Sequence, residues 1–218
     1  MTWTFRSVAR SATAAHVGHP RAWISRYRVQ LTSLVLFLVF LLLRLPFRGK
    51  SPANWDAVQM ALGVQAFDVQ HHQPHPPGYI GYIAIGKLLT MLTGDAHAAL
   101  IIISIIAGGS VAATMYLLAS RFMSNANAIG VAAAFGSSML VWYYSEVALT
   151  YIVELAILLP FLYLVARPLQ DARPSPQSLL VASFLLAMIG AFRQTALILF
   201  VPLWIWALWN YNWRWRGL

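Results

Sequence analysis

The sequence predicts an all-α protein with about six membrane-spanning helices. Of its 218 residues, 60% are hydrophobic and 10% are charged, whereas soluble domains carry about 25% charged residues, so much of the apolar surface should face lipid. The apolar residues are grouped in long runs, and the basic residues are scattered between them. That scatter favours membrane orientation over nucleic-acid binding as the reason for the +9 charge. The absence of cysteine excludes disulfides and thiolate metal sites.

A basic tail precedes the first apolar run. Residues 1–28 contain five arginines and no acidic residue, a composition shared by cytoplasmic tails and organellar transit peptides, of which we favour the tail. The run 29–47 is long enough to cross a bilayer once. Because the basic cluster lies just before it, we expect the amino terminus in the cytoplasm.

Further spans are expected at 96–120, 127–144, 147–166, 178–192 and 195–210. We expect a break near Arg193, because one helix over 178–209 would be too long for a bilayer about 30 Å thick. A basic and aromatic cytoplasmic tail, 211–218, ends the chain. The domain prediction is therefore one transmembrane module, 29–210, whose first extracytoplasmic loop is 48–95.

The apolar run 78–92 is short for a span and contains Lys87. If this segment crossed the membrane, eight basic residues would lie on the extracytoplasmic side and seven elsewhere. If it does not cross, ten basic residues lie on the cytoplasmic side and five on the extracytoplasmic side. The second arrangement obeys the positive-inside tendency, so we expect this segment on the outer face and both termini in the cytoplasm.

The first loop contains a predicted surface helix. Asn54 is a good N-cap, and a helix from there could run to about Val69. At helical spacing, polar or small residues form one stripe and apolar residues another, as in an amphipathic juxtamembrane helix. The stripes are Asp56, Gln59, Gly63, Ala66 and Gln70 against Trp55, Val58, Leu62 and Val69. Asp56 could accept a proton from a substrate hydroxyl; the alternative is that it complements the helix dipole, worth about 0.3–1 kcal/mol.

Three histidines, His71, His72 and His75, follow among prolines. Prolines hold the backbone extended and keep neighbouring rings apart, and the spacing of a structural zinc site is missing. We therefore favour a rigid turn over a metal site. His75 would then be available as a hydrogen-bond donor to a phosphate or a sugar.

Carboxylates and one arginine are predicted near the outer face. Glu146, Thr150 and Glu154 recur every four residues and would line one face of a span, where carboxylates are usually functional. Arg193 lies on the same side in this topology, so a structural ion pair with Glu146 is an alternative. A guanidinium also suits a phosphate, because it can hold two oxygens at once.

The order of these features resembles a known family. It consists of Asp56 with a short helix, His75–Tyr79, a helix ending Lys87–Leu89, a span closing on Ser120–Phe122, and Tyr143–Glu146 with Tyr151 after it. Over about Leu31 to Trp209, the chain resembles the amino-terminal half of GT-C superfamily glycosyltransferases. These include the protein O-mannosyltransferases, the aminoarabinose transferases, and the RgtA/B/C/D-like and DUF2723-type families.

The resemblance implies an inverting transfer of a sugar from a polyprenyl-phosphate carrier to an extracytoplasmic acceptor. Asp56 would be the general base. Because Trp-Asp-Ala stands where relatives have an acidic pair, Glu146 is the expected second acid. Arg193, with Lys87 or His75, would neutralise the leaving phosphate. The expected substrate-binding residues are Tyr79, Tyr144 and Gln194.

The expected partners are a polyprenyl-phosphate sugar and membrane lipids, and the expected location is the bacterial inner membrane. The sequence requires no cofactor and leaves a divalent metal open. Family members are usually longer, so two interpretations stay open: a whole enzyme, and a truncated or partial one whose carboxy-terminal half a partner chain could supply. The alternatives are a transporter or lipid-phosphate-binding protein without catalysis, and an assembly subunit whose charges pair with one another.

Overall fold

The computed structural model describes residues 20–167 and 175–216, and the side chains within 27–167 and 175–211. In these ranges the regular structure is helical, apart from one isolated antiparallel bridge between Asp68 and Gln73. The predicted all-α fold is therefore confirmed. Helix also extends into both predicted tails, and the remainder of those tails, 1–19 and 217–218, lies outside the described residues.

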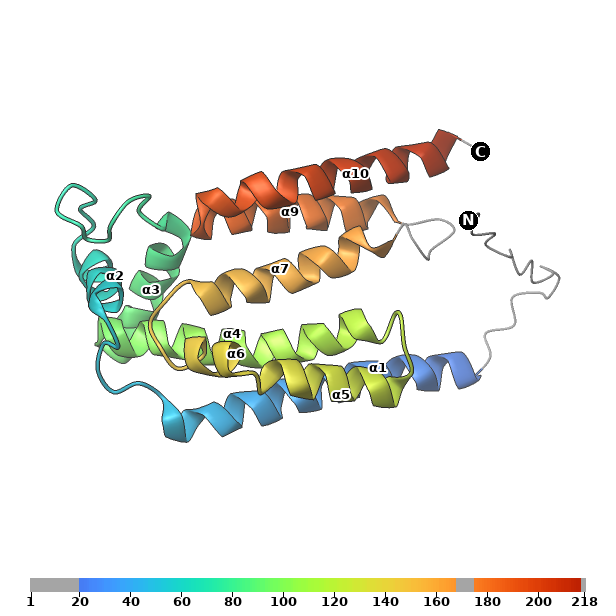
Figure 1. Ribbon diagram of the computed structural model, residues 1–218, viewed down its shortest axis with the longest axis horizontal. Helices are drawn as coiled ribbons and strands as arrows, with labels where there is room; N and C mark the ends of the chain where they lie inside the picture. Colours follow the sequence, from blue (N-terminus) through green and yellow to red (C-terminus); the bar gives the residue numbers. More distant parts are fainter. Residues whose placement is uncertain (1–19, 168–174, 217–218) are drawn as a thin grey trace, which may run out of the picture.

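The long helices form an elongated bundle that the chain traverses back and forth (Figure 1). In chain order the helices of the bundle are α1 (Pro20–Arg44) with the short η1 (Leu45–Phe47), α4 (Ala96–Ala119), α5 (Asn125–Gly136) with α6 (Met139–Tyr144), α7 (Tyr151–Val165), α9 (Pro176–Phe192) with η2 (Gln194–Ala196), and α10 (Leu197–Arg216). The start of α1 and the end of α10 lie at the same end of the bundle, which we call the tail end.

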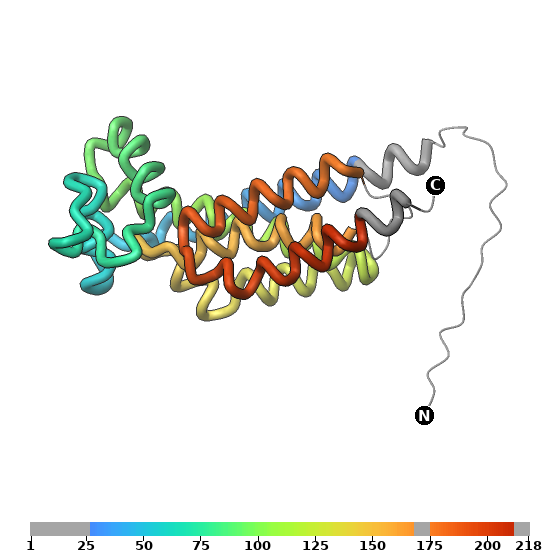
Figure 2. The backbone as a smooth tube through the Cα atoms, turned by 90° about the horizontal axis from the view of Figure 1, so that it is seen from above, coloured from blue at the N-terminus to red at the C-terminus, as the bar shows by residue number. Residues whose placement is uncertain are grey.

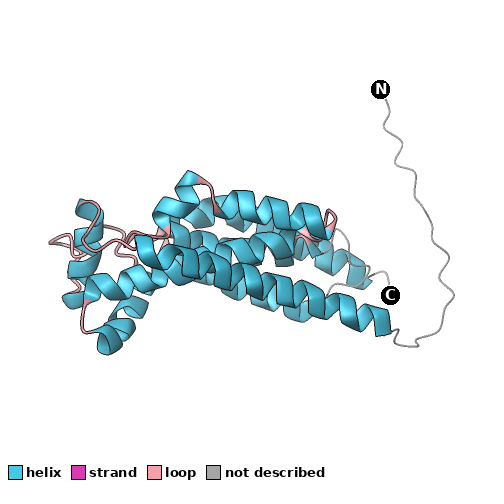
Figure 3. Cartoon of the chain, turned by 90° about the horizontal axis from the view of Figure 1, so that it is seen from below, coloured by secondary structure: helices cyan, strands magenta, loops and turns pink. Residues whose placement is uncertain are grey.

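Two shorter helices cover the opposite end, which we call the loop end. They are α2 (Trp55–Gln65) and α3 (Ile80–Thr93), and both pack against the first part of α4. Figure 2 shows them as a separate cluster beyond the ends of the long helices. The segment between α2 and α3 is irregular, as the loop colouring of Figure 3 shows.

Helix α4 lies at the centre, packed against α1, α5 and α7. Glycines allow α1 to approach it closely: a Cβ on Gly109 would lie 2.9 Å from the backbone oxygen of Phe37. The side chain of Arg44, at the end of α1, is fully buried beside this contact. Its guanidinium donates to the backbone oxygens of Phe40, at 2.7 Å, and Gly136, at 2.8 Å.

Helix α2 ends earlier than predicted. It stops at Gln65 instead of near Val69, and Ala66 is extended. The reason lies in Asp68, whose Oδ1 accepts hydrogen bonds from the backbone N–H groups of Gln70 and His71. Such local side-chain bonds give the backbone an alternative to the helix. The predicted apolar stripe is also not the buried one: Trp55 is 68% exposed, while Gln59 is buried.

Two of the predicted spans are interrupted or shortened. The segment 127–144 is divided between α5 and α6 at Ser137 and Ser138, residues that favour caps and turns over helix interiors. The next helix begins at Tyr151 instead of 147. The prediction that Glu146, Thr150 and Glu154 share one helical face is therefore wrong, because only Glu154 lies within α7.

The predicted break near Arg193 is present. Arg193 has extended backbone angles, φ −154° and ψ 98°, between α9 and the short helix η2. The chain reverses there, so α9 and α10 pack side by side as an antiparallel pair. Arg193 is thereby placed at the loop end of the bundle, beside the start of α7.

By length and composition, two helices in the described part of the chain could cross a membrane. They are Tyr27–Phe47 and Ala96–Ala119. The helices Ile80–Thr93, Tyr151–Val165 and Pro176–Phe192 are apolar but shorter. On this measure the structure supports two of the spans that the sequence predicted.

We predict that Gly108→Ala destabilises the protein by about 1–3 kcal/mol, the cost of overfilling a packed core. A Cβ at this position would overlap the side chain of Ser145 and lie 2.9 Å from Nε of Arg44. Gly130→Ala in α5 is the control, because a Cβ there meets nothing within 4 Å. Thermal unfolding in detergent should show a lower melting temperature for Gly108→Ala than for wild type, and no decrease for Gly130→Ala. Equal melting temperatures for the two variants would contradict the packing.

Candidate functional site

Polar side chains from four separate segments meet in a small pocket at the loop end. We call it the polar pocket; it is lined by Asp56, Met60, His75, Tyr79, Leu149, Thr150, Tyr151 and Arg193. Four of these residues, Asp56, His75, Tyr79 and Arg193, are site residues that the sequence predicted. The fold therefore brings four of the eight predicted site residues together in this pocket, and the other four do not line it.

Local structure positions Asp56. Oδ1 of Asn54 accepts a hydrogen bond from the backbone N–H of Ala57 at 2.9 Å, which begins α2 as the sequence predicted. Asp56 falls in the first turn of this helix and is exposed. A carboxylate in that position is stabilised by the helix dipole while it remains accessible to a ligand.

His75 connects the proline-containing segment to α2 and α3. Its Nδ1 lies 2.7 Å from Oε1 of Gln59, and its Nε2 lies 3.0 Å from the hydroxyl of Tyr79. With the amide oxygen of Gln59 as acceptor, Nδ1 carries the proton and Nε2 accepts from the Tyr79 hydroxyl. The histidine is thus held in one orientation at the edge of the polar pocket.

Tyr79 has an unusual backbone conformation. Its φ of 45° and ψ of 45° lie in the left-handed region, which residues other than glycine seldom adopt and which is often found at functional sites. Burial raises the pKa of the Tyr79 hydroxyl, and the positive charge of Arg193 partly opposes this rise. The hydroxyl therefore stays protonated at neutral pH and can act as a hydrogen-bond donor.

Arg193 is held by two contacts from α7. Its Nη1 lies 3.5 Å from Oε2 of Glu154, and its guanidinium lies over the ring of Tyr151 with 4.8 Å from Cζ to the ring centroid. The carboxylate distance exceeds the 2.7–2.9 Å of a tight charge-assisted hydrogen bond. A guanidinium has five N–H donors, so this pair leaves capacity for an anionic ligand.

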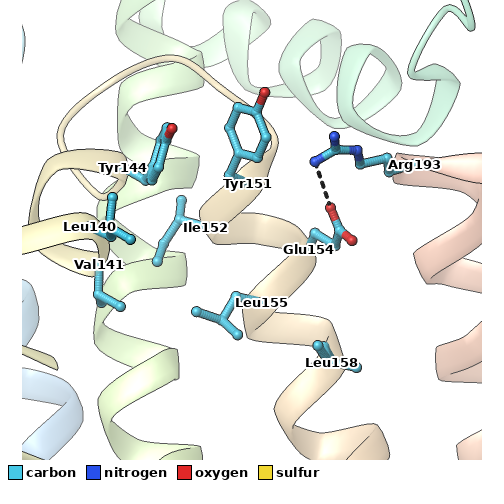
Figure 4. A pocket seen from close by; sticks show the side chains of 9 residues that line it. All are labelled: Leu140, Val141, Tyr144, Tyr151, Ile152, Glu154, Leu155, Leu158 and Arg193. Carbon is cyan, nitrogen blue, oxygen red and sulfur yellow. Dashed lines mark ion pairs between the residues drawn. The ribbon is translucent and has the colours of Figure 1, made fainter. Parts of the chain in front are cut away.

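An apolar groove adjoins the polar pocket. Figure 4 shows its lining residues, which are Leu140, Val141, Tyr144, Tyr151, Ile152, Glu154, Leu155, Leu158 and Arg193. It has a volume of about 330 Å³, whereas the polar pocket has about 10 Å³, roughly the space of one water molecule. Tyr151 and Arg193 belong to both, so they stand where the polar and apolar regions meet.

Glu146 lies elsewhere. Its backbone oxygen accepts from the N–H of Gly49 at 3.0 Å, and it lines neither the polar pocket nor the apolar groove. Burial raises the pKa of its carboxyl, while the nearby charge of Arg44 and a hydrogen bond from Trp142 partly oppose this rise. The ion pair considered between Glu146 and Arg193 is not formed: Glu154 is the partner of Arg193.

Of the other predicted site residues, one lines the apolar groove and two line neither cavity. Tyr144 lines the apolar groove, with its ring 4.7 Å from that of Tyr151. Lys87 in α3 and Gln194 in η2 are exposed and line neither cavity. Nδ1 of His71 lies 2.5 Å from Oδ2 of Asp68, and His71 does not line the polar pocket. Among the described residues, no group of three His, Asp or Glu side chains could hold a metal ion.

The sequence prediction of the site omitted Thr150, Tyr151 and Glu154 as lining residues. Glu154 and Thr150 had been noticed for their spacing, but the assumed helical face paired them with Glu146. A shift of the helix start to Tyr151 turns Thr150 and Tyr151 toward the polar pocket. No capping signal marked this start, because Thr150 has helical backbone angles and its side chain makes no capping hydrogen bond.

Comparisons with known proteins add no family assignment: no protein-family model, curated protein or solved structure matches the chain.

We predict that Glu146→Gln removes a pH dependence of stability. Because the folded pKa of Glu146 is raised, the folded state binds more protons than the unfolded state above the unfolded pKa of about 4.3. Its contribution to the free energy of unfolding therefore falls as pH rises from there through the folded pKa. Because glutamine resembles the protonated carboxyl, the melting temperatures of wild type and variant should agree near pH 4, and that of wild type should fall below that of the variant as pH rises to 8. Parallel curves would show that Glu146 is not perturbed.

Proposed function

We propose that the chain is an integral membrane protein whose loop end faces outward. Large apolar side chains are exposed along the bundle: Leu31 and Leu42 of α1 are 62% and 58% exposed, and Leu180 of α9 and Ile198 of α10 are 70% and 77% exposed. Apolar surface of this extent is unfavourable in water and favourable in a bilayer. The two helices of spanning length and apolar composition are consistent with this placement.

The orientation rests on charge. In the sequence, the segments expected on the cytoplasmic side contain ten arginines and one acidic residue, Asp171. The described arginines of this group, such as Arg121 and Arg167, lie at the tail end, whereas Asp56, Asp68 and Asp95 belong to the loop end. Basic residues are enriched on the cytoplasmic side of membrane proteins, so the polar pocket would open on the extracytoplasmic side.

We further propose that the protein is a GT-C-like glycosyltransferase that uses a polyprenyl-phosphate sugar. One observation supports this proposal. Asp56 and Arg193 are distant in sequence, yet they line one pocket next to an apolar groove of about 330 Å³. A base, a phosphate-binding cation and an apolar channel are the three elements that such a reaction needs.

The chemistry assigns a role to each group. The Asp56 carboxylate accepts the proton of the acceptor hydroxyl, whose oxygen attacks the anomeric carbon. The bond from that carbon to the phosphate oxygen breaks, and the electron pair leaves with the phosphate. Arg193 stabilises the negative charge that develops there. Attack on the face opposite the phosphate inverts the anomeric configuration. Glu146 takes no part in this scheme.

The apolar groove supports a lipid-linked donor. Below Glu154 its wall consists of side chains such as Leu155 and Leu158 on α7 (Figure 4). A prenyl chain lying there would place its phosphate beside Arg193, at the upper end of the groove. The apolar wall favours this donor over a transporter, which would need a hydrated path past Glu154 toward the tail end.

The polar pocket must widen to admit a sugar, because about 10 Å³ accommodates roughly one water molecule. The irregular segment between α2 and α3 supplies His75 and Tyr79 and is the part of the wall outside the helix bundle. We propose that donor and acceptor bind as this segment moves outward. Asp56 is already exposed, so it can reach the acceptor without a change in α2.

One observation favours a second candidate function, lipid-phosphate binding without catalysis. The pair between Arg193 and Glu154 already neutralises part of the charge available to a phosphate. A protein that only held the lipid headgroup would need Arg193 and the apolar groove but not Asp56. The assay described next separates the two functions.

We predict that Asp56→Asn lowers sugar transfer by about 10²–10⁴-fold, the typical contribution of a general base. Purified protein is incubated with radiolabelled polyprenyl-phosphate sugars, and transfer to acceptors and donor binding are both measured. Asp95→Asn is the matched control, because Asp95 caps α4 through Oδ1 and asparagine caps equally well. Donor binding without transfer by wild type would favour the second function. Equal transfer by wild type and Asp56→Asn would remove Asp56 as the base.

A further inference from the structure

Helix α2 carries a buried polar residue that the proposed sugar transfer does not use. Gln59 has 7% of its surface exposed, and it lines neither the polar pocket nor the apolar groove. It lies about one turn after Asp56, on the same face of α2. Because a buried amide needs hydrogen-bond partners, the contacts of Gln59 indicate its role.

The segment between α2 and α3 is seated along this face of α2. A Cβ on Gly63 would lie 2.6 Å from Cδ of Pro74, so glycine allows the segment to approach the helix closely. One turn earlier on α2, Oε1 of Gln59 lies 2.7 Å from Nδ1 of His75. The contacts therefore run along α2 toward its first turn, where Asp56 lies.

The contact with Gln59 determines which nitrogen of His75 carries hydrogen. The amide oxygen can only accept, so Nδ1 is protonated and Nε2 of the neutral imidazole has a free lone pair. Nε2 lies 3.0 Å from the hydroxyl of Tyr79, and the two rings meet edge to face with centroids 5.0 Å apart. The Tyr79 hydroxyl therefore donates its single hydrogen to His75, and its oxygen can only accept from a ligand.

The Tyr79 hydroxyl lies close to the charged groups of the polar pocket. Burial is the main cause of the raised pKa of this hydroxyl, and the charges of Arg193 and Asp56 also act on it. Tyr79 and Asp56 both line the pocket, whose volume is about 10 Å³. Two hydrogen-bond acceptors, a carboxylate and a phenol oxygen, thus border a space of roughly one water molecule.

We propose that Gln59 is a positioning residue that acts through His75 on Tyr79, and that the acceptor substrate is therefore a vicinal diol. Its reacting hydroxyl donates to the Asp56 carboxylate, and the neighbouring hydroxyl enters the polar pocket and donates to the Tyr79 oxygen. One hydroxyl cannot serve both groups, because it has a single hydrogen. An ammonium group has several hydrogens, but Arg193 lines the same pocket and repels its charge.

This inference rests on the proposed function and names the class of its acceptor substrate. Substrates enter while the segment between α2 and α3 is moved outward, and the hydrogen bond between Gln59 and His75 forms again when the segment returns. Asp56 is exposed, so the reacting hydroxyl can remain outside the pocket. Its neighbour is about the size of a water molecule and fits the closed pocket.

The first measurement determines the tautomer of His75 and needs no substrate. The full chain, with isotopically labelled histidine, is studied by nitrogen NMR in detergent at about pH 8, where histidine is neutral. The signals of His75 are identified by their loss in His75→Gln. Wild type should carry hydrogen on Nδ1, whereas Gln59→Met, which lacks the amide oxygen, should not hold this tautomer. Gln65→Met, at the exposed end of α2, is the matched control and should retain it.

The second measurement compares two isomeric probes with the same octyl chain. These are 1-O-octylglycerol, a vicinal diol, and 2-O-octylglycerol, whose hydroxyls are one carbon further apart. Binding to the full chain in nanodiscs is measured by saturation-transfer NMR. Wild type should bind the vicinal diol about tenfold more tightly, equivalent to about 1.4 kcal/mol, the effect of one further hydrogen bond. Tyr79→Phe and Gln59→Met should lose this preference, and Gln65→Met should retain it.

Three outcomes would overturn the proposal: a wild-type His75 protonated at Nε2 alone, equal binding of the two isomers by wild type, and a preference that survives in Tyr79→Phe. Circular dichroism confirms that each variant is folded, and Tyr79→Phe preserves the test if Gln59→Met does not fold. Neither measurement requires sugar transfer, whereas the assay with Asp56→Asn does. Failure of the proposed function and failure of this inference are therefore distinguishable.

Discussion

The buried guanidinium of Arg44 constrains how the helices meet. A charge removed from water must be satisfied by hydrogen bonds or by partners of opposite charge. Two backbone oxygens, from α1 and from the end of α5, supply hydrogen bonds, and the rings of Phe40 and Trp142 lie beside the guanidinium. Glycine at 108 leaves room for it against α4. The spacing of α1, α4 and α5 therefore depends on this side chain, and the region after α6 is arranged around it.

That arrangement determines which acid belongs to the site. The backbone oxygen of Glu146 accepts from the N–H of Gly49, so the chain between α6 and α7 lies beside the end of α1, and α7 begins at Tyr151. Glu154 is then the carboxylate that meets Arg193. The two arginines therefore have different partners: Arg44 binds backbone oxygens inside the bundle, whereas Arg193 pairs with Glu154 beside the polar pocket.

The two ends of the bundle differ chemically. The loop end combines carboxylates, hydroxyls and Arg193 beside the apolar groove. The tail end has a second apolar cavity between α4, α7 and α10, whose lining residues are all apolar.

The helical class, the N-cap at Asn54 and the break at Arg193 could be predicted from the sequence, because each follows from local pattern or charge. Four residues of the polar pocket were also predicted, Tyr79 among them only through the family resemblance. The sequence could not determine where α7 begins or which acid pairs with Arg193. Residues 147–165 are apolar almost throughout, so they carry no periodicity that locates a helix start or a buried face. These points became visible in the folded protein, because ion pairing and helix ends in such a segment depend on how closely distant helices approach.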